Sequence, residues 1–183
     1  MNPVQIGDAG LELRYNPFPI VKRLWGYLRE SNTLFKSAIS ISWFWFIGAG
    51  ILSLLPVYCR DALNVNEQVV TAFLAMFTIG IAVGSVICEK LSADRVELGL
   101  VPIGSIGLSA FLADLSWAPI AWSTSTALGL SEFVAQPGTA RLLIDFFLMS
   151  VSGGIFIVPL YTVLQERSRR EVRSQIIAGN NII

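Results

Sequence analysis

Histidine is missing from this 183-residue chain, and cysteine occurs only twice. The absence of histidine excludes a histidine metal site and a histidine proton relay. Cys59 and Cys88 end neighbouring apolar runs, so antiparallel helices would place the two thiols on opposite faces of a bilayer, about 30 Å apart and beyond disulfide reach. We therefore expect no disulfide, and the cysteine spacing indicates neither a metal nor a redox site.

Charged side chains are also scarce, at 14% of residues, whereas a soluble domain has about 25%. Hydrophobic residues make up 54% of the chain, and its mean hydropathy is +0.63. Because a helix rises about 1.5 Å per residue, roughly 20 apolar residues cross the hydrocarbon core of a membrane. The uncharged runs predict an all-α, polytopic membrane protein with spans near residues 38–58, 69–89, 98–116 and 142–164.

Motifs of catalysis are missing as well. The chain has no G-x-S-x-G turn and no Walker loop, and its cysteines are isolated. We therefore expect no enzymatic activity, no cofactor, no metal site and no nucleic-acid partner.

The basic residues predict how the spans are oriented. Four spans in series place the first, third and fifth flanking segments on one side of the membrane, and that side carries ten lysines and arginines against two on the other. The two are Arg60 and Arg141. By the positive-inside rule, both ends of this segment are predicted to be cytoplasmic.

Three further predictions concern regions outside the four spans. Residues 1–36 are expected to be a cytoplasmic linker in which a basic, amphipathic helix over residues 20–30 lies at the membrane surface, or forms an ordinary solvated helix. The connection over residues 117–139 could hold a short surface helix. From about residue 174 the sequence looks like the opening of a fifth span, so we expect a partial sequence, with residues 37–183 forming part of a larger bundle of membrane helices.

Small residues recur within the spans. Gly80 and Gly84 lie four apart in the second span, and Ser150 and Gly154 lie four apart in the fourth. Such pairs allow two membrane helices to approach closely, so these four residues are candidate packing positions. Pairs of this kind also arise by chance in apolar segments.

Two groups of charged residues flank the spans. Arg141 and Asp145 are four apart at the start of the fourth span, which predicts an ion pair within one helix or contacts at the outer mouth of a pathway. Asp114, near the outer end of the third span, is similarly ambiguous. None of these residues lies at mid-membrane depth, where an ionisable group would be a functional candidate.

The second group lies in the short loop that follows the second span. Glu89, Lys90, Asp94 and Arg95 alternate in sign there, so they could form ion pairs that break when the helices slide, or could simply be solvated. The loop resembles the charged loop between the second and third helices of each half of major facilitator superfamily transporters. In the family pattern an aspartate follows a glycine after three residues, and basic residues surround a second glycine. This chain departs from it because its acidic residue, Glu89, lies one position later, and Ala93 replaces the second glycine.

Longer stretches resemble the lysophospholipid transporter branch of that superfamily. These stretches are residues 42–49, 88–92, 96–102, 158–161 and 176–181, and the resemblance extends over about residues 17–183. It implies the start of the second six-helix half: the central linker, helices seven to ten and the beginning of helix eleven.

The resemblance implies that the parent protein carries lysophospholipids, chiefly lysophosphatidylethanolamine, across the bacterial inner membrane. A fused or separate acyltransferase would re-acylate them there. Two other hypotheses remain: a facilitator that exports drugs or small solutes, and a membrane-embedded anchoring module without transport activity.

Overall fold

The computed structural model describes residues 18–29, 31–92, 98–117 and 126–168. Within these ranges the secondary structure is helical apart from turns and one isolated bridge. The helices are α1 (Phe18–Arg29), α2 (Asn32–Asp61), α3 (Glu67–Ser92), α4 (Leu100–Trp117), α5 (Leu130–Val134) and α6 (Thr139–Arg167). By length and composition, α2, α3, α4 and α6 can each cross a membrane, which confirms the prediction of an all-α chain with four spans.

α2, α3 and α6 extend past both ends of their predicted spans, whereas α4 begins two residues after residue 98 and ends one residue after residue 116. α2 begins six residues before the predicted span at residue 38, and α6 ends three residues after residue 164. Helix formation continues into the polar flanks because backbone hydrogen bonding depends little on side-chain polarity. The possible fifth span from residue 174 lies outside the described residues.

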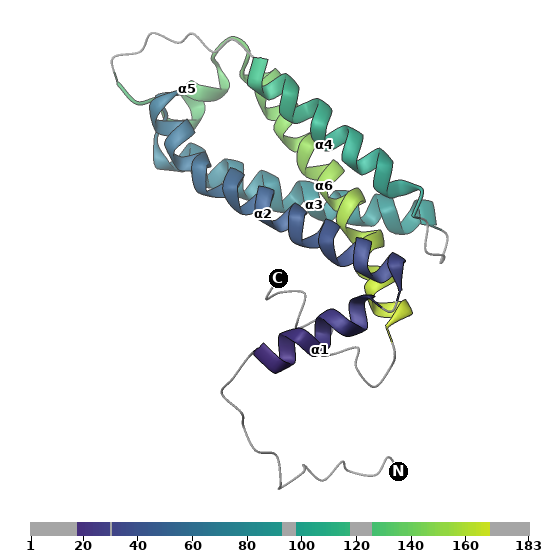
Figure 1. Cartoon of the computed structure of the whole chain (residues 1–183). Helices are drawn as coiled ribbons and strands as arrows, with labels where there is room; N and C mark the ends of the chain where they lie inside the picture. Colours follow the sequence, from purple (N-terminus) through teal and green to yellow (C-terminus); the bar gives the residue numbers. More distant parts are fainter. Residues whose placement is uncertain (1–17, 30, 93–97, 118–125, 169–183) are drawn as a thin grey trace, which may run out of the picture.

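α6 is the central helix of the bundle (Figure 1). In the most apolar 18-residue stretch of α6, 61% of the residues are buried. The corresponding values are 17% for α2 and α3 and 6% for α4. α4, α3 and α2 all pack against α6. The other three long helices therefore leave most of their surface available to lipid or to further helices.

The main hydrophobic core lies at the end of the bundle that carries α5, called here the α5 end. Phe73 of α3 makes edge contacts with Phe133 of α5 and Phe146 of α6, at centroid distances of 5.9 and 5.0 Å. Beside this core, the turn after α2 pairs with the segment before α5. Asn66 donates its backbone N–H to Leu128 at 3.0 Å, so the two connections are fixed to each other.

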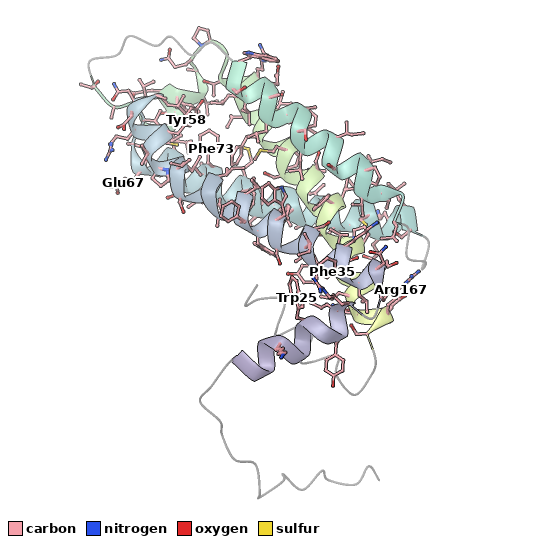
Figure 2. All side chains as sticks on the ribbon, viewed as in Figure 1. Trp25, Phe35, Tyr58, Glu67, Phe73 and Arg167 are labelled. Atoms are coloured by element: carbon pink, nitrogen blue, oxygen red, sulfur yellow. The ribbon has the colours of Figure 1, made fainter. Side chains whose placement is uncertain are left out.

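A smaller core lies at the opposite end, where α1 meets α2 and α6. Leu28 of α1 is buried there, at 2% exposure. The Arg29 guanidinium lies 5.3 Å from the ring of Trp25 and 5.8 Å from that of Phe35, and both rings lie near the α1–α2 junction (Figure 2). These cation–π contacts hold the C-terminal end of α1 against the start of α2.

Candidate functional site

The closest contact between α3 and α6 is made by small residues. A Cβ atom added to Gly84 would lie 2.1 Å from the carbonyl oxygen of Val151, and one added to Gly80 would lie 2.5 Å from Cβ of Ser150. On α6, a Cβ atom at Gly154 would lie 2.4 Å from the carbonyl oxygen of Ile81. The four candidate packing residues thus share one interface, at which the two backbones nearly touch.

A second close contact joins α4 to the other side of α6. A Cβ atom at Gly104 would lie 2.6 Å from the backbone nitrogen of Phe156, and one at Gly107 would lie 2.4 Å from Oγ of Ser152. The sequence gives no signal that pairs Gly104 and Gly107 with α6, because their spacing of three is less distinctive than the four-residue spacing on α3. Glycines at the two interfaces allow α3 and α4 to pack closely on opposite sides of α6.

Charged residues from α4 and α6 meet at the α5 end. Arg141 donates two hydrogen bonds to the carboxylate of Asp114, 2.5 Å from Nη2 to Oδ1 and 3.1 Å from Nε to Oδ2. Its Nε lies 3.7 Å from Oδ2 of Asp145, one turn along α6. The sequence predicts only this pair within α6; the stronger contact crosses to α4.

Asp145 differs from its two partners in burial. Its side chain is 10% exposed, whereas those of Arg141 and Asp114 are 53% and 40% exposed. Oδ2 of Asp145 is buried and accepts no hydrogen bond within the described structure. The carboxyl groups of Asp114 and Asp145 thus meet at one guanidinium, whose Nε lies 3.1 Å from Oδ2 of Asp114 and 3.7 Å from Oδ2 of Asp145.

A cleft runs between α2 and α4, with α6 at its base. α2 packs on α6 and α3 rather than on α4, so the cleft stays open. It contains two cavities of about 260 Å³ each, which share Ile51, Leu112 and Met149 in their walls. Their lining is apolar apart from a few hydroxyl groups. Arg141, Asp114 and Asp145 line neither cavity.

The loop after α3 is described only in part. Glu89 and Lys90 are exposed in the last turns of α3, and neither forms an ion pair within the described part of the chain. Asp94 and Arg95 lie outside the described residues. That these four residues form a gating loop, in which ion pairs break when the helices slide, stays a prediction.

Cys59 and Cys88 are both buried free thiols. Within the described ranges, no group of three or more histidine, cysteine, aspartate or glutamate residues could hold a metal ion.

The sequence profile of the Major Facilitator Superfamily matches residues 3–183, nearly the whole chain. The chain belongs to this superfamily. Proteins of the superfamily are typically permeases without enzymatic activity. Together with the four long apolar helices, this membership makes the chain part of a multi-pass membrane transporter.

The relatives with curated names that are described here share 30% of their aligned residues with this chain. The chain is 30% identical over 184 residues to "Lysophospholipid transporter LplT" of Enterobacter sp. (strain 638), covering 97% of this chain and 39% of the relative. It is also 30% identical to proteins of the same name from Klebsiella pneumoniae (strain 342) and Escherichia coli (strain K12 / DH10B), covering 94% and 84% of this chain. The chain thus spans about two fifths or less of the length of these relatives. No solved structure matches it significantly.

Proposed function

We propose that this chain is part of a transporter that carries lysophospholipid across the bacterial inner membrane for re-acylation. The observation that carries the proposal is the 30% identity, over 94–97% of the chain, to the Enterobacter and Klebsiella relatives named lysophospholipid transporters. The similarity extends across all four long helices, so it is not confined to one short motif.

The described helices are compatible with an amphipathic cargo. Within the described ranges, charged groups on the long helices lie toward the helix ends, and the middle of the bundle presents apolar side chains with scattered serine hydroxyls. A hydrocarbon chain can cross such a surface without breaking buried ion pairs, whereas an ionic solute would have to lose its hydration there without compensating contacts.

The described part of the chain does not enclose a pathway. The cleft between α2 and α4 is open, and the relatives contain more than twice the length of this chain. We therefore propose that further helices of the full-length protein complete the pathway. The test of cargo must accordingly use the full-length protein.

The test is transport by the purified full-length protein in liposomes. We expect labelled lysophosphatidylethanolamine to cross several-fold faster than in protein-free liposomes, and diacyl phosphatidylethanolamine to cross at the background rate. A matched preparation carrying Gly84→Leu, whose side chain would force α3 and α6 apart at this contact, should transport at background. Transport of a drug-like cation with no movement of lysophospholipid would overturn the proposal and favour the exporter hypothesis.

Orientation is a second part of the proposal. We propose that the α5 end faces away from the cytoplasm, because ten of the thirteen basic residues flank the opposite ends of the spans. In intact spheroplasts, an impermeant thiol reagent should label Ser131→Cys, in α5, and should not label Glu89→Cys, at the end of α3. Both positions are exposed, and the native Cys59 and Cys88 are buried and give little background. The reverse labelling pattern would refute this orientation.

A further inference from the structure

The charged cluster at the α5 end has more negative than positive groups. Two carboxyl groups, from Asp114 and Asp145, face one guanidinium, from Arg141. Arg141 is already committed to Asp114 through two hydrogen bonds. If both carboxyl groups were ionised, the cluster would carry a net charge of minus one.

The position of Asp145 makes that charge unfavourable. Its side chain is nine-tenths buried, and its Oδ2 receives no hydrogen bond from any described donor. A buried carboxylate is stable only when its oxygens accept hydrogen bonds or face a close cation. The nearest cation lies 3.7 Å away and is directed at another carboxylate. Asp145 also lies beyond the first turn of α6, so it gains little from the helix dipole.

We propose that Asp114 and Asp145 share one proton at neutral pH, in a carboxyl pair that joins α4 to α6 and is held in place by Arg141. A proton on one carboxyl group donates a hydrogen bond to an oxygen of the other, so the unpartnered oxygen gains a partner. The cluster then carries two negative charges, one bound proton and one guanidinium, which sum to zero. Proton sharing between adjacent carboxyl groups is the usual outcome when both cannot ionise together.

Among the residues that the structure describes, no other ionisable group pairs with Asp114 or Asp145. On α2, Arg60 and Asp61 pair with each other at 2.7 Å, and Tyr58 lines the neighbouring cavity. On α5, the carboxylate of Glu132 accepts the N–H of Gly129, and at the start of α3 Glu67 is exposed. Residues 118–125 contain no ionisable side chain.

A proton fits this cluster better than a metal cation. Arg141 already places a positive charge beside both carboxyl groups, and two acidic residues offer too few ligands for a metal ion. The proposal does not depend on the cargo of the transporter, because it concerns the contact between α4 and α6 alone.

The direct test is infrared spectroscopy of the full-length protein in lipid at neutral pH. A protonated carboxyl group has a carbonyl stretch that shifts in heavy water and is distinct from that of a carboxylate. We expect this band in the difference spectrum between the parent protein and Asp145→Asn. The matched control, Asp61→Asn, removes a carboxylate that is exposed and paired with Arg60, and its difference spectrum should lack the band. Identical spectra for the parent protein and Asp145→Asn in that region would overturn the proposal.

Thermal unfolding in detergent gives an independent readout. Asparagine resembles the protonated acid, so Asp145→Asn should unfold near the parental temperature at neutral pH. The native parent protein binds one more proton here than the unfolded chain, so its stability should fall as pH rises. Its unfolding equilibrium constant should increase by up to about tenfold per pH unit relative to Asp145→Asn, between about pH 6 and the pH at which the shared proton is lost. A large loss of stability in Asp145→Asn with no such pH dependence would show an ionised Asp145 and contradict the proposal.

Discussion

Replacing Gly84 with alanine is expected to destabilise the helix bundle strongly. The new Cβ atom would lie 2.1 Å from the carbonyl oxygen of Val151 and 3.0 Å from Cα of Gly154, so α3 and α6 must separate. Both obstacles are backbone atoms, which no side-chain rotation can move. Overpacking typically costs about 1–3 kcal/mol, and we expect Gly84→Ala to reach or exceed the upper part of that range. The measurement is the thermal midpoint of the full-length protein in detergent, with its yield in the membrane.

Gly50→Ala is the matched control, because it places the same methyl group within another membrane helix. Gly50 lies in α2, and nothing is within 4 Å of its Cβ position. Alanine is favoured over glycine in a helix by about 0.5–1 kcal/mol, so this variant should be neutral or slightly more stable. Equal thermal midpoints for the two variants would show that α3 and α6 are not in close contact at Gly84.

Replacing Phe73 with alanine should produce the second large loss of stability. Phe73 is 2% exposed, and its ring contacts those of Phe133 and Phe146, so it joins α3 to α5 and α6. Removing a buried phenylalanine ring costs about 3–5 kcal/mol in protein cores, because contacts are lost and a cavity remains. In a membrane the packing part of that cost persists, since lipid chains cannot enter the buried space. We expect a lower thermal midpoint and faster proteolysis near α5.

Phe46→Ala provides the comparison for this substitution. Phe46 is 71% exposed on α2, where it stacks on Trp43 at a centroid distance of 5.8 Å. Truncating it removes surface that faces outward from the described helices, so the thermal midpoint should change little. If Phe46→Ala destabilised the protein as much as Phe73→Ala, the outward face of α2 would be as tightly packed as the core at the α5 end.

The four membrane helices could be predicted from sequence because each depends on a local property, a run of mostly apolar residues with few charges that is long enough to cross a bilayer. The contacts between helices depend on how each helix is rotated about its axis, which no local pattern specifies. Arg141 shows the difference. Its neighbour Asp145 is visible four residues away, but its main partner, Asp114, is 27 residues distant and on another helix.

Burial was equally difficult to predict. Asp145 has the sequence context of a residue at the membrane surface, and only the packing of α4 against α6 shows that its side chain is enclosed. The contact of Gly104 with Phe156 was likewise invisible, because the partner of a small residue is set by the helix that happens to face it. Sequence could name candidate residues, but the structure was needed to pair them.

The central position of α6 has a consequence for the order of synthesis. A ribosome makes α2, α3 and α4 before α6, yet most contacts of those three helices are with α6. Within the described residues, α2, α3 and α4 have little contact with one another before α6 is made, apart from a small contact between α2 and α3. Each is apolar enough to enter the membrane alone, so insertion and assembly are separate events in this chain. Among the helices described here, the earlier ones therefore enter the membrane before most of their packing partners within this segment exist, and they gain those contacts only when α6 arrives.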